Sequence, residues 1–356
     1  MKASVIDLFC GIGGLSHGFY LEGFDVVAGI DIDESCRYAF ERNNEAKFIA
    51  KGVEDLIPGE LKKLYPKDGI KILVGCAPCQ PFSNYTQQYD KKRKKGKTNV
   101  RQDNKWKLLY AFADMIEEVQ PDIVSMENVP QLTGRRGSKV YEAFLETLKN
   151  NGYEIDSQIV FCPDYGIPQT RKRLVLLASR KGKIRFIAPT HKPENYVTVR
   201  DTISKLLKIP DGGISPKDRF HRASKLTKRN RDRIINSKQG GTWRDWNKKL
   251  QLECHQKESG KTYPGVYGRM SWDVPSPTIT TQFYGFGNGR FGHPNQNRAI
   301  SIREAALLQT FPKNYEFLKP SDRVTFKKLG QFIGNAVPVS LGRAIAKSIK
   351  AHIENL

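Results

Sequence analysis

The chain contains no apolar run near the roughly 18 residues that a membrane-spanning helix needs. Its first residues, Met1–Phe9, form too short a stretch for a signal peptide. Cysteine is also sparse, and its six positions do not form the dense framework of a small secreted domain. We therefore expect a cytoplasmic protein whose thiols are free: Cys10, Cys36, Cys76, Cys79, Cys162 and Cys254.

Acidic residues are in deficit. The chain has 37 Asp and Glu against 59 Lys and Arg, so its net charge is +22. This balance fits a polyanionic partner such as nucleic acid far better than a small anionic molecule, although some proteins that touch anionic membranes are also basic. At 356 residues the chain is long enough for one large domain and a smaller second one.

From the start to about residue 180, short β-rich apolar runs alternate with helical patterns. This alternation predicts an α/β fold, doubly wound, with a mostly parallel sheet and helices on both faces. Two segments with apolar residues at helical spacing, Lys105–Val119 and Val140–Leu148, are the expected crossover helices. The expected strands are Ser4–Phe9, Asp25–Ile30, Ile70–Val74, Asp122–Met126 and Arg173–Ala178.

The character of the sequence changes after about Lys181. It becomes basic, rich in Gly, Pro and aromatic residues, and poor in long periodic runs until about Arg298, which predicts a second, smaller lobe. Helical patterns then return over Ile302–Gln309 and Val339–Ile353, the latter preceded by Pro338, a residue suited to the start of a helix.

A glycine-rich turn follows the first expected strand. Phe9-Cys10-Gly11-Ile12-Gly13-Gly14 leads into a helical pattern, so that free backbone N–H groups and the helix dipole can face a ligand. The turn departs from the dinucleotide fingerprint because Ser16 stands where that pattern has its third glycine. Asp31, at the end of the second strand, is placed to accept hydrogen bonds from ribose hydroxyls. Together they indicate an adenosyl-type cofactor, with an ordinary strand-to-helix turn as the alternative.

A thiol and a carboxyl group follow two neighbouring strands. Cys79 lies just after the Ile70–Val74 strand, and Glu127 ends the next one, so both are expected at the carboxyl edge of the sheet, where ligands bind. Such a pair suits addition to an electron-poor ring. Cys76 and Cys79 also resemble a thioredoxin-like redox pair, so a redox protein with a nicotinamide cofactor remains an alternative.

Two arginines lead into the last expected strand of the sheet. The segment Gln169-Thr170-Arg171-Lys172-Arg173 presents guanidinium groups, which bind a base oxygen or phosphates with fixed geometry. A solvated basic strand end is the alternative, and the position at the same sheet edge favours the binding role.

In these motifs and in their order, the chain resembles the cytosine-5 DNA methyltransferase family over nearly its whole length. The resemblance implies a Rossmann-like fold dependent on S-adenosylmethionine, and methyl transfer to carbon 5 of a cytosine flipped out of specific double-stranded DNA, through a covalent bond between Cys79 and C6. The matching segments are Phe9–Gly14, Asp31, Pro78-Cys79-Gln80, Glu127-Asn128-Val129, Gln169–Arg173, Arg303–Pro312 and Gly334-Asn335-Ala336-Val337-Pro338.

The resemblance also implies roles for single residues. Cys79 would be the nucleophile, Glu127 would contact and protonate N3, and Arg171 and Arg173 would hold the base and backbone. The expected DNA contacts are Gln80, Ser83, Arg171 and Arg173. The expected cofactor contacts are Phe9, Gly11, Gly13, Gly14, Leu15, Asp31, Ile32, Pro78, Leu108, Asn335 and Val337. No metal site is expected.

One position departs from the family pattern. Many relatives carry an acid for the adenine amino group just after the third strand, where this chain has Gly52, followed by Val53, Glu54 and Asp55. The contact with the adenine amino group is therefore left open in this chain, with Glu54 and Asp55 as the candidate substitutes.

The resemblance implies how the two lobes are built. Residues 1–185 and 299–356 would form the catalytic, cofactor-binding domain, with the last helix packed beside the first motif, and residues 186–298 would form the target-recognition domain. The basic segment Lys91–Lys97 would belong to a loop that closes over DNA. At least half of the aromatic residues of the second lobe are expected in its core: Trp243, Trp246, Tyr263, Tyr267, Phe283, Tyr284 and Phe286.

The nearest alternative is a relative that methylates cytosine in transfer RNA. The large basic second lobe favours DNA, and a monomeric bacterial modification enzyme paired with a restriction endonuclease is the expected context. A redox protein would lose activity on Cys76→Ala, whereas the methyltransferase interpretation expects that variant to be tolerated and Cys79→Ala to be inactive.

Overall fold

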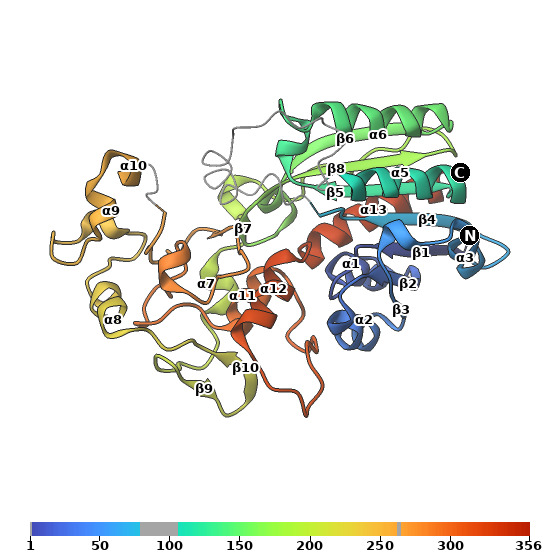
Figure 1. Ribbon diagram of the computed structural model, residues 1–356. Coiled ribbons are helices and arrows are strands. Elements are labelled where there is room, and N and C mark those ends of the chain that lie inside the picture. Colours follow the sequence, from blue (N-terminus) through green and yellow to red (C-terminus); the bar gives the residue numbers. More distant parts are fainter. Residues whose placement is uncertain (1, 79–105, 262–264) are drawn as a thin grey trace. The chain divides into compact units, whose positions relative to one another are not determined.

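The computed structural model describes residues 2–78, 106–261 and 265–356, which divide into two compact units (Figure 1). Unit 1 consists of Met1–Phe161, Lys172–Pro189 and Val339–Leu356. Unit 2 consists of Cys162–Arg171 and Thr190–Pro338. The segment 299–356, expected to be catalytic, is therefore shared between the units, and the functional division into a catalytic and a recognition region stays a prediction.

Unit 1 is built on a seven-stranded sheet with the order β3-β2-β1-β4-β5-β8-β6. Only β8 is antiparallel to its neighbours, β5 and β6. The predicted mostly parallel sheet is confirmed, and the five strands expected from the sequence are all present. The strands are β1 Ala3–Leu8, β2 Asp25–Asp31, β3 Lys47–Ala50, β4 Ile70–Gly75, β5 Ile123–Asn128, β6 Glu154–Phe161 and β8 Lys172–Ser179.

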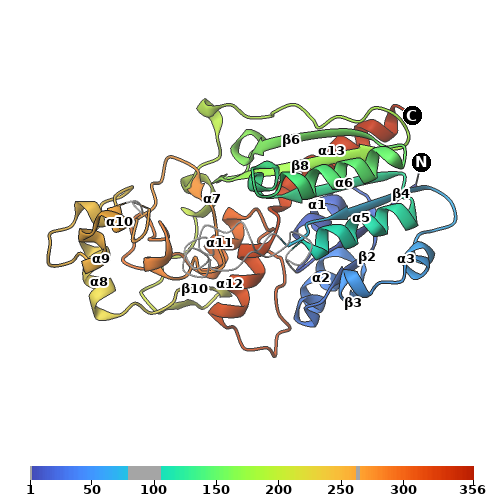
Figure 2. The ribbon, with the colours of Figure 1, turned by 45° about the horizontal axis from the view of Figure 1, so that its top comes forward.

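The helices of unit 1 cover both faces of this sheet. The connections through α1 and α2 run across the sheet in one direction, and those through α3, α5 and α6 run in the other. Because such crossovers are right-handed, the two groups lie on opposite faces. Figure 2 shows α5 and α6 on one face and α13 on the other. The helices are α1 Gly14–Leu21, α2 Arg37–Asn44, α3 Pro58–Leu64, α5 Lys107–Val119, α6 Ser138–Asn150 and α13 Val339–Glu354.

Helix α5 shows why these segments fold as they do. Leu109, Phe112 and Ile116 recur at helical spacing and are buried against the sheet, in one cluster with Leu73 of β4 and Val124 of β5. The apolar stripe seen in the sequence is thus the face that holds the helix to the strands. At the other end of the chain, α13 packs against α1, as the family resemblance implied.

Unit 2 has little regular structure. Its helices are α7 Val199–Ile203, α8 Lys228–Ile235, α9 Glu253–Gln256, α10 Glu258–Lys261, α11 Ile302–Leu308 and α12 Phe326–Asn335. Its strands form two short pairs, β9 Ile214–Ser215 with β10 Asp218–Arg222, and β7 Gln169–Thr170 with β11 Ser276–Pro277.

Aromatic side chains form much of the core of unit 2. Trp243, Trp246 and Phe286 are buried in one cluster, and Phe283 is fully buried. The expectation that at least half of the aromatic residues named in the sequence lie in the core is confirmed, although Tyr263 lies outside the described residues. None of the helices in the described segments is long and apolar enough to cross a membrane.

Candidate active site

The sheet of unit 1 reverses its strand order between β1 and β4. In open α/β sheets such a reversal opens a crevice beyond the carboxyl ends of the strands, where ligands bind. The segments at the carboxyl ends of β1, β4 and β5 are among those predicted from the sequence to carry the chemistry. The topology therefore brings the predicted cofactor turn and the predicted acid to one sheet edge.

The glycine-rich turn after β1 is held in a left-handed backbone conformation. Phe9 has φ 59°, Gly11 has φ 51° and Gly13, the N-cap of α1, has φ 85°. Phe9 adopts a conformation that L residues rarely occupy, and such strain is concentrated at functional sites. A side chain added at Gly11 would meet no atom within 4 Å, so the turn presents open backbone to a ligand.

Asp31 at the end of β2 is tied to this turn. Its Oδ2 accepts a hydrogen bond from the Gly11 N–H at 2.8 Å, and its Oδ1 accepts one from the Asp33 N–H at 2.9 Å. Burial raises the pKa of Asp31, while these two N–H groups act in the opposite direction. Its neighbour Ile32 leaves 75% of its surface exposed, which is unusual for a large apolar side chain.

A second carboxyl group lies beneath the turn. Asp7 of β1 is buried, and its Oδ2 accepts a hydrogen bond of 2.5 Å from the Ser16 hydroxyl of α1. Burial raises the pKa of Asp7 to about 7, although the Ser16 bond lowers it. The serine that replaces the third glycine of the dinucleotide pattern therefore joins the first turn of α1 to the end of β1.

Glu127 is held between two neighbouring strands. Its side chain is 2% exposed, and its Oε1 lies 2.8 Å from Nε of Arg173 on β8. Its Oε2 accepts a hydrogen bond of 2.7 Å from the Cys76 thiol, immediately after β4. The predicted acid and one of the two predicted arginines are thus in direct contact.

Asn128 was not singled out from the sequence as a site residue. It is buried, and its side-chain amide donates a 3.3 Å hydrogen bond to the carbonyl of Ala77, two residues before Cys79. Its own Oδ1 accepts from the Val129 N–H. The position of Asn128 directly after Glu127, at a strand end, was the available signal for this role.

Arg171 has surroundings different from those of Arg173. It belongs to unit 2, where it is 4% exposed and where Nη1 lies 3.4 Å from Oε1 of Gln169 and 3.3 Å from the carbonyl of Ile279. Gln169 in turn donates to Oε1 of Gln309 at 2.8 Å. The two arginines that the sequence treats alike thus contact different partners.

Several predicted site residues lie outside the described residues: Cys79, Gln80, Ser83 and the basic run Lys91–Lys97. The remaining cofactor candidates are divided between the units. Leu15 is buried in α1, Pro78 is exposed after β4, and Leu108 is half-buried in α5. In unit 2, Asn335 ends α12 with an exposed side chain, and Val337 is buried.

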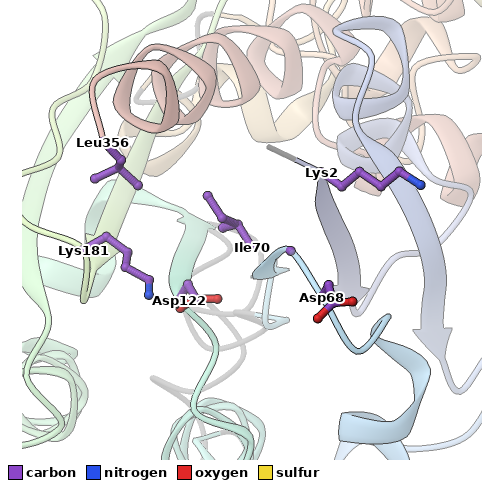
Figure 3. A pocket seen from close by; sticks show the side chains of 7 residues that line it. Lys2, Asp68, Ile70, Asp122, Lys181 and Leu356 are labelled. Atoms are coloured by element: carbon purple, nitrogen blue, oxygen red, sulfur yellow. Dashed lines mark ion pairs between the residues drawn. The ribbon is translucent and has the colours of Figure 1, made fainter.

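A cavity of about 710 Å³ lies at the other edge of the same sheet (Figure 3). Ile70 at the start of β4 and Asp122 just before β5 line it, and Lys181 pairs with Asp122 at 3.2 Å. It is thus separated from the turn and from Glu127 by the length of the strands. Among the described residues no cluster of His, Cys, Asp and Glu is arranged to hold a metal ion.

Comparison with known proteins identifies relatives of this chain. The family model described as C-5 cytosine-specific DNA methylase matches residues 3–351. The chain is 54% identical over 356 residues to the type II methylase M.HgiDII of Herpetosiphon aurantiacus, covering 100% of this chain and 97% of that protein. It is 31% identical over 353 residues to the type II methyltransferase M.PspPI of a Psychrobacter species, covering 97% and 78%.

Solved structures share the fold. A prophage-encoded protein of E. coli, described as a DNA modification methyltransferase, matches with a TM-score of 0.74 and 22% identity, covering 99% of this chain and 100% of its own. At that identity the likeness supports the α/β fold with its seven-stranded, mostly parallel sheet.

Proposed function

The chain belongs to the C-5 cytosine-specific DNA methylase family and is a DNA (cytosine-5)-methyltransferase, and from this premise we propose the roles of its residues. The family uses S-adenosylmethionine as methyl donor. Our proposal is that Cys79 attacks C6 of the target cytosine and that Glu127, held by Arg173, serves N3 of the same ring. Its strongest support is the buried position of Glu127 at the end of β5, beside the segment that leads to Cys79.

The proposed reaction begins with addition of a thiolate to the cytosine ring. The Cys79 thiolate forms a bond to C6, and the displaced electron pair moves through the ring to N3, which takes a proton from Glu127. C5 then has the character of an enamine carbon and takes the methyl group. Loss of the C5 proton to water, return of the N3 proton to Glu127 and breaking of the C6–sulfur bond release 5-methylcytosine and restore both the thiolate and the acid. The bound cofactor supplies the electrophilic methyl group.

The target base must leave the helix for this chemistry. C6 and N3 are inaccessible inside stacked duplex DNA, so we propose that the cytosine is flipped by about 180° into the site. The proposed DNA contacts are Gln80, Ser83, Arg171 and Arg173.

The turn after β1 fits an adenosyl ligand. Its backbone is open at Gly11, the first turn of α1 offers N–H groups with no partner inside the helix, and Asp31 supplies a carboxylate. The exposed apolar surface of Ile32 suits a flat aromatic ring. We propose that Phe9, Gly11, Gly13, Gly14, Leu15, Asp31, Ile32, Pro78, Leu108, Asn335 and Val337 hold S-adenosylmethionine.

Gly52 stands where many relatives have an acid for the adenine amino group. A Cβ built on Gly52 would lie 3.0 Å from Oδ2 of Asp55 and 3.1 Å from Oε2 of Glu54. Both carboxylates therefore occupy the space that an acidic side chain at position 52 would enter. This supports the proposal that one of them replaces the missing acid.

Covalent trapping tests the proposal directly. DNA containing 5-fluorocytosine should form an adduct that mass spectrometry assigns to Cys79, since fluorine at C5 cannot leave as a proton does. An adduct on another side chain, or none, would overturn the proposed nucleophile. Cys79→Ala should be inactive, and Glu127→Gln should bind the cofactor nearly normally while transferring methyl groups far more slowly.

The DNA sequence in which the enzyme methylates cytosine can be determined in cells. We propose that the enzyme modifies one specific DNA sequence and works beside a restriction endonuclease, which the type II relatives support. Bisulfite sequencing of DNA from a host that expresses the protein should reveal protected cytosines in a single context. A parallel assay with transfer RNA separates the family's DNA function from the RNA alternative, and only duplex DNA is expected to accept the methyl group.

We also propose that the basic run Lys91–Lys97 contacts DNA phosphates. If these lysines and arginine contact phosphates, neutralising them should flatten the dependence of DNA affinity on salt concentration. An unchanged slope would exclude phosphate contact by this segment.

A further inference from the structure

Cys76 occupies a position that the methylation chemistry described above leaves unused. Its thiol donates to Oε2 of Glu127 at 2.7 Å, while Nε of Arg173, on the opposite neighbouring strand, forms an ion pair with Oε1 at 2.8 Å that is not aligned as a hydrogen bond. In the pairing of β4 with β5, Gly75 lies opposite Met126. The residues that follow them, Cys76 just after β4 and Glu127 in β5, therefore lie side by side.

We propose that Cys76 is a positioning residue, whose thiol fixes the orientation of the Glu127 carboxyl group toward the flipped cytosine. The inference rests on the proposed role of Glu127. A carboxyl group turns easily about its last side-chain bond, because that torsion has broad minima. The ion pair with Arg173 attracts Oε1 without an aligned hydrogen bond, so the hydrogen bond that the Cys76 thiol donates to Oε2 is the contact that defines the plane of the group.

The two partners of the carboxyl group also differ chemically. The guanidinium of Arg173 can only donate, whereas a thiol donates to a carboxylate and can accept weakly from a carboxylic acid. Cys76 therefore suits a carboxyl group that gains and loses a proton during each turnover. Since Oε1 already faces a permanent cation, Oε2 is the oxygen on which the proton would reside, and this is the oxygen that Cys76 contacts.

The thiol contact predicts a defined kinetic defect. Cys76→Ala should remain active, as the sequence analysis expects, but with kcat lower on the order of fivefold, which corresponds to the loss of one ordinary hydrogen bond from a weak thiol donor. The KM for S-adenosylmethionine should be unchanged. Cys76→Ser retains a donor and should restore most of the rate, while Cys254→Ala, which removes an exposed cysteine of unit 2, should behave as wild type.

A double-mutant cycle separates positioning from a general structural effect. In a Glu127→Gln background, Cys76→Ala should cause no further loss of kcat, because its partner is already changed. Additive losses, or a serine variant no faster than the alanine variant, would overturn the proposal. Thermal melting of each variant monitors folding.

Two cysteine variants separate the role of Cys76 from that of the proposed nucleophile. If Cys79→Ala is inactive and Cys76→Ala turns over like wild type, only the role of Cys76 is wrong. If Cys79→Ala remains active, the proposed nucleophile itself fails.

Discussion

Gly18 of α1 and Gly342 of α13 lie back to back where the first and last helices of unit 1 pack together. A Cβ added at Gly18 would stand 2.4 Å from the carbonyl carbon of Gly342, closer than any real contact allows. The absence of both side chains lets the two helix backbones approach. This contact joins the helix that follows the cofactor turn to the carboxyl-terminal helix.

Gly18→Ala should destabilise the protein. In an ordinary helix the same change stabilises by roughly 0.5–1 kcal/mol, so the sign of the effect reports the helix contact. Overpacking against backbone should cost about 1–3 kcal/mol and lower the Tm by several degrees. Gly59→Ala in α3 is the matched control, since a Cβ there meets no atom within 4 Å. A rise in Tm for both variants would contradict the packing described.

A buried ion pair in unit 2 should be essential for stability. Arg298 and Glu304 are 0% and 1% exposed and share two bonds of 2.7 Å. Burial alone raises the pKa of Glu304, but the bonds and charge of Arg298 outweigh it and lower the value to about 2.

Glu304→Gln leaves the guanidinium buried without its counter-charge and should cost about 3–5 kcal/mol of unfolding free energy, measured by urea denaturation. Asp273→Asn breaks the exposed pair with Arg200 and should cost under about 1 kcal/mol. Equal losses of unfolding free energy in the two variants would contradict the expectation that the buried pair contributes more than the exposed one.

Substitutions of Arg171 and of Arg173 should have different effects on kcat and on Tm. Arg173 contacts Glu127, so Arg173→Lys, which keeps a positive charge beside the buried carboxylate but loses the guanidinium geometry, should lower kcat roughly 10-fold with little change in Tm. Arg171 contacts Gln169 and the Ile279 carbonyl, so Arg171→Ala should lower the Tm of the protein. If Arg171→Ala instead keeps its Tm and loses kcat, that guanidinium acts on the base, as the family resemblance implies.

The sequence predicted the sheet because each central strand is a short apolar run. The two edge strands, β3 and β6, were not among the predicted ranges; in β6 only Val160 is buried, and half of its eight residues are polar. An edge strand needs one apolar face at most, so it lacks the continuous apolar signal of β4 or β5. The antiparallel direction of β8 was likewise hidden, because periodicity carries no information about strand direction.

The contacts in the candidate active site were likewise predicted only in part. Spacing brought Glu127 and Arg173 to one edge, and their contact bears this out. The contacts of Cys76 with Glu127 and of Asn128 with Ala77 depend on strand register, which a single sequence does not specify. Arg171 belongs to unit 2 and Arg173 to unit 1. The two residues are only two positions apart, and nothing in the sequence between them indicates that the chain passes from one unit to the other.

The buried carboxyl group of Asp7 should make stability fall as the pH rises from about 4 to 7. Burial raises its pKa from the ordinary 3.8 to about 7 in the folded protein, so the unfolded chain releases its proton first. The stabilisation is therefore complete below about pH 4 and lost by about pH 7. The raised pKa of Asp31 acts in the same direction, whereas burial lowers the pKa of His293 to about 4 and makes its contribution rise over the same range. The contribution of Asp7 is therefore read from the difference between wild type and an Asp7 variant.

Asp7→Asn keeps a group that can accept from Ser16 and cannot ionise, so it should flatten this part of the profile. Tm measured from pH 4.5 to 8 for wild type and Asp7→Asn gives the comparison, and Asp273→Asn, whose carboxylate is exposed, serves as the control. The difference between Asp7→Asn and wild type should grow with pH in favour of the variant. A constant difference across this range would mean that Asp7 does not titrate there.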